Sequence, residues 1–142
     1  MSALLTKRLT LILLTALSPV GLAACGEMVS TSSFAGESKA VAQTISNLQN
    51  DVSTASNSNI CQKDLASALR ARLSTASGGC QQAVKNQLGQ IDTFTLTIRS
   101  IAVKGTSATA QVSSTYSGKS KVSTVLLLKE GGKWKLSGVH QP

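Results

Sequence analysis

The sequence predicts an α+β fold, with three N-terminal helices packed on a curved four-stranded antiparallel sheet. Apolar residues recur every three or four positions between Glu37 and Leu88, which is the period of one helix face. From Phe94 to Val139 they recur every two positions, which is the period of a strand. Short glycine-containing turns separate these strand segments, as in hairpin-connected neighbours. Helices followed by consecutive strands are typical of an α+β domain.

The N-terminus has the organisation of an export signal. Lys7 and Arg8 precede an uncharged, Leu-rich run over residues 9–24. This run is shorter than the roughly 20 apolar residues of a spanning helix. Pro19 and Gly21 loosen its last turns, which favours cleavage over retention. We therefore expect residues 1–24 to be a signal peptide.

The end of this run, Leu22-Ala23-Ala24-Cys25, resembles the lipobox of bacterial lipoprotein signals. The resemblance implies that the Cys25 sulfur receives a diacylglyceryl group, that the signal is removed, and that the new amino terminus is acylated, for example with palmitate. Two or more acyl chains give stable anchoring, whereas one gives marginal binding. We expect a lipid-anchored protein on the extracytoplasmic face of the cell membrane. An uncleaved anchor with an unmodified cysteine is the alternative.

A tether and one domain follow the lipidation site. Residues 26–36 are rich in Ser, Thr and Gly and lack periodic apolar residues, so with Cys25 they predict a flexible tether (25–36) of about 15–20 Å mean reach. Residues 37–142 have room for a single domain. The net charge of +8 falls to +6 when Lys7 and Arg8 are lost with the signal. The remaining basic residues are dispersed, so we interpret them as a solvated surface.

Three helices are predicted at the start of the domain. The first begins at Glu37 and ends in the polar run 53–59. The second begins near Cys61, with Asn59 as its cap, and ends before the Gly pair 78–79. The third opens at Cys80 and closes at Gly89. Their inward stripes are Val41, Ile45, Leu48 and Val52, then Leu65, Leu69 and Leu73, and finally Val84 and Leu88.

Four strands are predicted after the helices. The first alternates from Phe94 and then shifts its phase, which indicates a bulge near Arg99–Ser100. The second covers residues 108–116. The third, residues 122–129, is apolar on both faces and should lie centrally. A turn at residues 130–133 leads into the last strand, residues 134–139.

Cys61 and Cys80 are the cysteines that remain after lipidation of Cys25. An even pair in an exported domain predicts a disulfide. A helix of about 12 residues carries the chain roughly 18 Å away, so the bridge closes only if the helix ends near Leu73 and the chain folds back. The spacing is unlike Cys-x-x-Cys, which favours a structural role.

The cysteine pair, the strand pair TFTLTIRSIAVKG and SATAQVSS, and the ending TVLLLKEGGKWKLSGV carry a family resemblance. Over about residues 37–139 the chain resembles the small NTF2-like (cystatin-like α+β) lipoproteins of unknown function found in actinobacterial envelopes. The resemblance implies a cone between sheet and helices, either open or filled, and allows a homodimer through the open sheet face. We expect the cone to be lined by Leu96, Ile98, Val112, Tyr116, Leu126, Leu128 and Trp134.

The sequence indicates no catalytic, metal or cofactor site. Its one histidine, His140, cannot supply a zinc ligand set, and no Gly-x-Ser-x-Gly or phosphate-binding glycine loop occurs. Some NTF2-like enzymes, such as ketosteroid isomerases, place a carboxylate base in the cone. None of the carboxylates here matches such a position, and we interpret Asp51 and Asp64 as solvated helix residues. The other carboxylates of the predicted domain are Glu37, Asp92 and Glu130.

Three functions stay open at this point. The first, which we expect, is a non-catalytic lipoprotein that binds an envelope protein or a small apolar molecule. The second is an isomerase or dehydratase with a cone carboxylate, which a buried acid of raised pKa beside a cavity would favour. The third is a structural surface module with a filled cone. Nucleic acid is excluded as a partner because the chain is exported and has few aromatic side chains for stacking.

Overall fold

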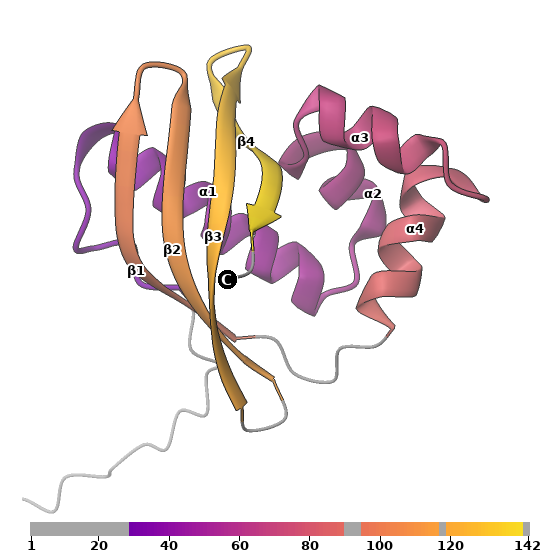
Figure 1. The fold of residues 1–142 in the computed structure, drawn as a ribbon, viewed down its shortest axis with the longest axis horizontal. Coiled ribbons are helices and arrows are strands. Elements are labelled where there is room, and N and C mark those ends of the chain that lie inside the picture. Colours follow the sequence, from indigo (N-terminus) through magenta and orange to yellow (C-terminus); the bar gives the residue numbers. More distant parts are fainter. Residues whose placement is uncertain (1–28, 90–94, 117–118, 141–142) are drawn as a thin grey trace, which may run out of the picture.

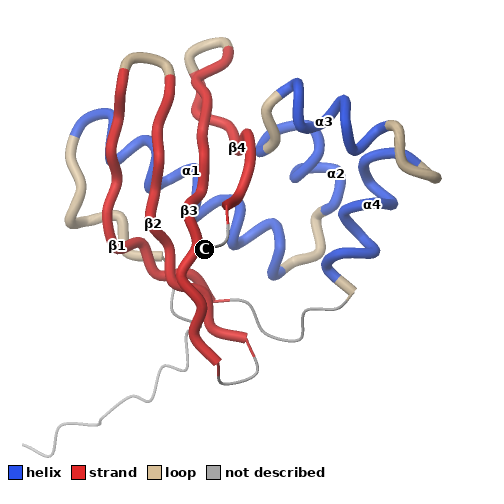
Figure 2. Tube along the Cα trace, in the orientation of Figure 1, coloured by secondary structure: helices blue, strands red, loops and turns tan. Residues whose placement is uncertain are grey.

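The computed structural model describes residues 29–89, 95–116 and 119–140 (Figure 1). The helices are α1 (Gly36–Ser53), α2 (Asn57–Asn59), the π-helical turn η1 (Ile60–Asp64), α3 (Ser67–Ser74) and α4 (Gly79–Leu88). The strands are β1 (Thr95–Lys104), β2 (Ser107–Tyr116), β3 (Lys119–Glu130) and β4 (Lys133–His140). All helices precede all strands (Figure 2), so the predicted α+β class is confirmed.

The strands form one antiparallel sheet in the order β1-β2-β3-β4. The predicted bulge is present, because the β1 register shifts between Ile98 and Ser100. A second register shift, between Leu126 and Leu127 on the β3–β4 pair, was not predicted. Each bulge bends its strand and increases the local twist. The sheet is accordingly curved, and β3 lies inside it as the sequence predicted.

Helix α1 covers one face of the sheet, and the opposite face is open in Figure 1. Val41, Ala42 and Ile45 are buried on α1 and contribute to the core against the sheet. Val29, in the segment predicted to be a tether, is only 5% exposed and packs in the same core. The packed part of the chain therefore begins before α1.

A second apolar cluster holds the helical half together. Its buried members come from η1, the residue after it, and α4: Ile60, Cys61, Leu65, Cys80 and Val84. The later residues of α1, Leu48 and Val52, pack against this cluster. Leu136 of β4 packs against both clusters and so connects the sheet core to the helical half.

The predicted second helix is divided in two, and its predicted cap is wrong. Leu65 and Ala66 are extended, with ψ angles of 138° and 150°. The Ala66 N–H donates to the Leu136 carbonyl at 2.7 Å, and Leu65 forms a parallel bridge with Leu136. Asn59 lies inside α2, where its side-chain amide donates to Asp51 Oδ1 at 3.2 Å. Pairing with the edge of β4 therefore interrupts a helix that the local pattern would continue.

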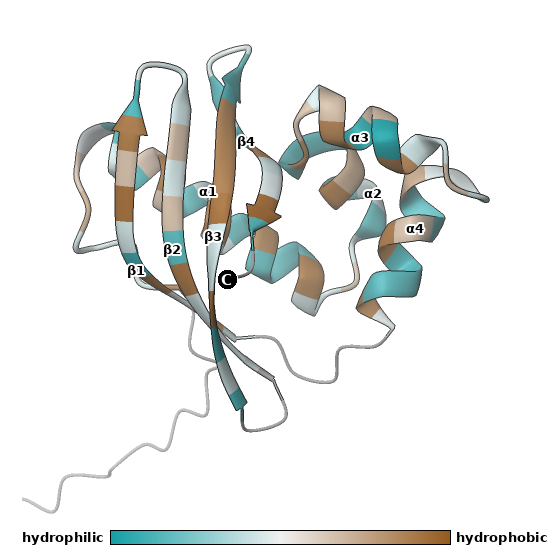
Figure 3. Cartoon of the chain, viewed as in Figure 1, coloured by the Kyte–Doolittle hydropathy of each residue, from teal (hydrophilic) through white to brown (hydrophobic). Residues whose placement is uncertain are grey.

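The predicted phase of the third strand is also wrong. Leu126 and Leu128 lie on the open face, and Leu128 is 38% exposed, whereas Val125 and Leu127 are buried. Residues 125–128 of β3 are all apolar and form a continuous brown stretch in Figure 3, so the pattern of this stretch does not select a face. The neighbouring strand selects it, because directly paired residues share a face. The buried residues Ala110 and Ala108 of β2 pair with Val125 and Leu127.

The predicted disulfide between Cys61 and Cys80 is present, with a Cα–Cα distance of 6.2 Å. It connects η1 to α4. The chain returns to Cys61 because α3 is short and because positive φ angles at Gly78 and Gly79 (82° and 73°) reverse its direction. Both Gly residues adopt a conformation that side chains disfavour.

We predict that the double variant Cys61→Ser/Cys80→Ser unfolds at lower urea concentration than the oxidised protein. The cysteines are 19 residues apart, and a crosslink over such a loop is worth about 3 kcal/mol in the loop-entropy model. Equilibrium urea denaturation measures the difference. Wild-type protein kept reduced is the matched control and should resemble the variant. Equal stability of the oxidised protein and the variant would contradict a stabilising bridge.

Candidate functional site

An apolar pocket of about 380 Å³ lies between the helical half and the end of β4. Aliphatic side chains from α1, η1, α3, α4 and β4 form its walls, and Gln87 is its one polar side chain among the described residues. The lining consists of Leu48, Val52, Ile60, Leu73, Ala83, Val84, Gln87, Leu88, Leu136 and Val139. Val139 is 51% exposed although it is apolar. Such a cavity suits a small apolar ligand.

The residues predicted to line the cone do not line this pocket. Leu96, Val112 and Trp134 are buried between the sheet and α1, and Ile98 packs beside them. Leu126 and Leu128 lie on the open face, as described above. The Tyr116 side chain lies outside the described part of the chain. These side chains therefore fill the core between α1 and the inner strands, and the apolar pocket lies farther along, at the helical half.

The sequence contained a signal for the true lining. Leu48 and Val52 belong to the predicted inward stripe of the first helix, and Val84 and Leu88 to that of the third. These stripes were interpreted as core contacts with the sheet. They instead face one another across the edge of β4, because the divided second helix places α3 and α4 beside the sheet rather than over it (Figure 1).

A second cavity, which we call the polar groove, has a volume of about 670 Å³. It lies between α1, η1 and the start of β4. Amide side chains of α1 form one wall, and lysines of η1 and β4 contribute to the other. The lining consists of Ala40, Gln43, Thr44, Asn47, Asn50, Asp51, Gln62, Lys63, Asp64, Gly132, Lys133, Trp134 and Lys135.

The polar groove contains a pair of carboxyl groups that the sequence did not predict to be buried. Asp64, at the end of η1, is only 6% exposed, and Asp51, in the last turn of α1, is half-buried. Asp51 is the acidic neighbour of Asp64 in this groove. Asp64 Oδ2 is buried without a hydrogen-bond partner. Interpreting both residues as solvated was therefore wrong, because the divided helix turns Asp64 toward α1.

Burial and the neighbouring acid favour the protonated form of Asp64. Loss of solvation is the main cause that raises the pKa of Asp64 to about 7, and the hydrogen bond and negative charge of Asp51 act in the same direction. Lys135 and Lys63 oppose this rise in pKa. The unpartnered Oδ2 is shielded from solvent. It is therefore placed for an internal contact rather than for contact with a molecule in the groove.

A hydrogen-bonded network joins the N-terminal end of α1 to the β3–β4 hairpin. Glu37 accepts one bond from Lys129 Nζ and one from the Trp134 indole N–H, both at 2.7 Å. These two bonds lower the pKa of Glu37. Lys129 also lies over the Trp134 ring, 5.6 Å from its centroid. Trp134 is therefore fixed as part of the core, at 5% exposure.

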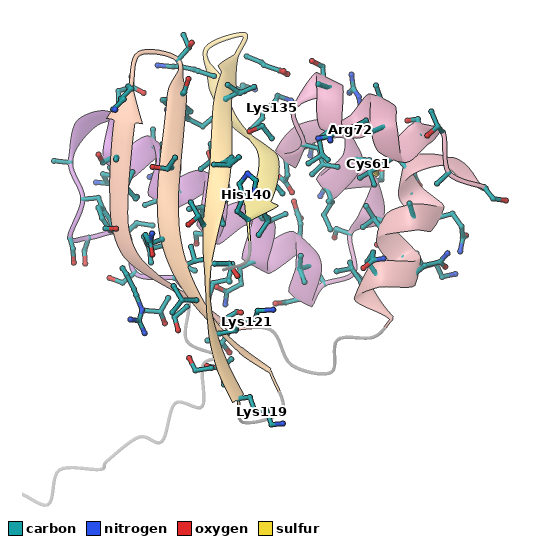
Figure 4. All side chains as sticks on the ribbon, viewed as in Figure 1. Cys61, Arg72, Lys119, Lys121, Lys135 and His140 are labelled. Carbon is teal, nitrogen blue, oxygen red and sulfur yellow. A yellow bond between two sulfur atoms is a disulfide. The ribbon has the colours of Figure 1, made fainter. Side chains whose placement is uncertain are left out.

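The labelled basic side chains lie in different parts of the molecule (Figure 4). Lys119 and Lys121 lie at the far end of β3, whereas Arg72 and Lys135 lie near the helical half (Figure 4). No group of three or more metal-binding side chains occurs within residues 29–89, 95–116 and 119–140. In the same ranges, no helix is long and apolar enough to cross a membrane. Cys25 and Asp92 lie outside them.

Two solved structures share this fold, although no protein-family model and no curated protein matches the chain. One is an NTF2-like protein of unknown function from Shewanella baltica OS155, with 19% identity and a TM-score of 0.50; the match covers 75% of this chain and 95% of that one. The other is an Rd1NTF2_05 variant, with 11% identity, a TM-score of 0.53, and coverage of 75% and 100%. The chain therefore has an NTF2-like fold. The lipoprotein part of the resemblance stays a prediction.

We predict that Asp64 makes the domain less stable as the pH rises from about 4 to about 7. The unfolded carboxyl loses its proton near its ordinary pKa of 3.8 and the folded one at about 7. Between these values the folded state binds more protons, so its stability falls with pH and levels off above 7. Asp64→Asn, which retains a donor toward Asp51, should remove this slope.

The measurement is urea denaturation of wild type and Asp64→Asn at a series of pH values. Near pH 4 the two should be equally stable, whereas near pH 8 the variant should be the more stable by a few kcal/mol, on the order expected for a shift of this size. Other titrating groups are present in both proteins, so the difference isolates Asp64. Parallel stability curves would show that Asp64 does not titrate in this way.

Proposed function

We propose that this protein is an extracytoplasmic, lipid-anchored lipoprotein whose NTF2-like domain binds a small apolar molecule without catalysis. The observation that carries the binding part is the apolar pocket of about 380 Å³, which is walled by aliphatic side chains and has an exposed apolar residue, Val139, in its lining. Removing apolar surface of the ligand from water supplies the binding free energy. The lipobox at Leu22 to Cys25 supports the anchoring part.

The composition of the pocket favours an aliphatic ligand with few polar groups. Its lining includes no charged side chain among the described residues, so an ion entering it would lose solvation without a partner. A ligand with an acyl or similar chain would meet aliphatic walls from five elements. An anchor at Cys25 would hold this pocket close to the membrane, which is a source of such molecules.

An enzyme with a cone carboxylate is the alternative. Asp64 has the raised pKa that would favour acid–base chemistry. However, it lines the polar groove and not the apolar pocket, and its unpartnered oxygen is covered. The position of this carboxyl therefore supports a role in packing η1 against α1 more than a role in catalysis.

We predict that Ala83→Trp abolishes binding of a neutral apolar probe. Ala83 lines the pocket from α4 and is half-buried, so an indole there would occupy the cavity. Titration with fluorescent N-phenylnaphthylamine should show an affinity at least about tenfold weaker than that of wild type, a loss of roughly 1.4 kcal/mol.

The matched control is Ala102→Trp, at an exposed position of β1. It adds the same side chain outside the pocket and should bind the probe as wild type does. Circular dichroism checks that both variants are folded. Failure of the wild type to bind, or undiminished binding by folded Ala83→Trp, would contradict the proposed pocket.

We predict that the mature chain begins at an acylated Cys25 and that Cys25→Ala is neither acylated nor retained on membranes. Two acyl chains give stable anchoring because each buried methylene contributes about 0.8 kcal/mol. Native mass spectrometry of protein extracted from its own membrane reports the acyl mass, the hydrogens lost in the disulfide and any retained ligand. Membrane fractionation compares the variant. An intact N-terminus at Met1 in the wild type would overturn the lipoprotein proposal.

A further inference from the structure

We propose that Asp51 and Asp64 form a proton-held latch that fixes η1 against α1, and that loss of the shared proton loosens the wall of the apolar pocket. The gating part of this inference rests on the proposed function, because it concerns ligand binding in that pocket. The latch itself rests on contacts in the helical half.

Contacts with three neighbouring elements, α4, β4 and α1, hold the η1 segment in place. The disulfide of Cys61 joins it to α4. The Ala66 N–H and Leu65 join its end to Leu136 of β4. The carboxyl of Asp64 neighbours that of Asp51 of α1 in the polar groove. Only the last of these contacts depends on the pH near neutrality.

The surroundings of Asp64 favour its protonated form. Asp51 lies in the last turn of α1, which has no basic residue, and Asp64 ends η1. Helix C-terminal ends disfavour negative charge because their carbonyl groups point outward. Asp64 Oδ2 has no donor, so an ionised Asp64 would leave a charged oxygen buried and unpaired.

The charged groups around the pair do not replace that proton. Lys63 of η1 and Lys135 of β4 act on Asp64 only through their charge. Lys135 Nζ donates to the Gln62 carbonyl at 3.5 Å, and Lys133 lines the same groove from β4. Asp51 itself accepts from the Asn59 amide. Ionisation of Asp64 would therefore place two carboxylates in contact, and their repulsion would separate η1 from α1.

This separation would reach the apolar pocket. Ile60 opens η1 and lines the pocket, and Val52, the residue after Asp51, lines it from α1. Both residues pack in the second apolar cluster. A shift of η1 away from α1 would thus move two walls of the same cavity apart. Protonation of the pair should close the pocket on its ligand.

The test measures probe binding and amide hydrogen exchange on the full domain at about pH 5.5 and about pH 8.5, where Asp64 is mostly protonated and mostly ionised. The probe is N-phenylnaphthylamine, which is uncharged at both values. Wild type should bind it at least about fivefold more weakly at the higher pH, the lower end of usual coupling between sites. Protection factors of amides 60–66 should fall in parallel.

Two variants make the result specific. Asp64→Asn keeps a donor toward Asp51 at every pH, so it should bind the probe and protect amides 60–66 equally at both values. Glu130→Gln removes a carboxyl that lies outside the pair but holds the start of α3, so its pH response and not its affinity is compared with that of wild type. Its hydrogen bonds from Ser67 lower the pKa of Glu130, so it is ionised throughout this range and the pH response should persist in the variant.

The outcomes separate the two proposals. Probe binding that is equal at both pH values in wild type overturns the gating. Protection factors that respond equally in wild type and Asp64→Asn overturn the latch. If the probe does not bind at either pH, the proposed function and the gating fail together, whereas a loss of protection in wild type alone still supports the latch.

Discussion

The pairing of Leu65 and Ala66 with Leu136 is the contact on which the arrangement of the helical half depends. Strand β4 is an edge strand, and an uncovered edge presents unpaired backbone groups. The Ala66 N–H donates a hydrogen bond to one of these groups, the Leu136 carbonyl. To do so, the chain leaves the helical conformation for two residues. This interruption places α3 and α4 beside β4 and directs Asp64 toward α1.

A hydrogen-bonded contact with Glu130 of β3 also holds the start of α3 in place. Both oxygens of the Glu130 carboxylate accept the Ser67 N–H at 3.1 Å, and the Ser67 hydroxyl donates to one of them at 2.8 Å. A carboxylate at the start of a helix satisfies free N–H groups and interacts favourably with the helix dipole. The pocket is therefore bounded by short helices fixed at their ends, and the space between them and β4 is not filled by their own side chains.

The sequence predicted the class of fold well because its periods are strong. The helix stripe ending at Val52 and the bulge near Ser100 could be predicted because each is visible in the local pattern of apolar residues. The disulfide could be predicted because two cysteines remain once Cys25 is set aside. The phase of β3 could not be predicted from its own residues, since Leu126 and Leu127 are equally apolar and only pairing with β2 distinguishes their faces. The break at Leu65 depends on a hydrogen bond to a residue 70 positions away in the chain.

The two cavities were missed for the same reason. Leu48 and Val52 of α1 were correctly assigned to an apolar stripe, but the sequence does not show which elements that stripe faces. Asp64 illustrates the difficulty, because an acid followed by Leu65 and Ala66 fits an exposed position on a continuous helix. Its burial follows only once the helix is interrupted and Asp51 is opposite.

The chemistry of position 64 distinguishes a latch from an ordinary internal hydrogen bond. An amide of similar size could donate to Asp51 at any pH, whereas a carboxyl does so only while it holds a proton. A carboxyl buried here therefore lowers the stability of the domain above neutral pH without adding a contact that an amide lacks. What it adds is dependence of the α1–η1 contact on pH. Ile60 and Val52 lie next to that contact and line the apolar pocket. The pH would therefore also affect the wall of the cavity that a ligand would occupy.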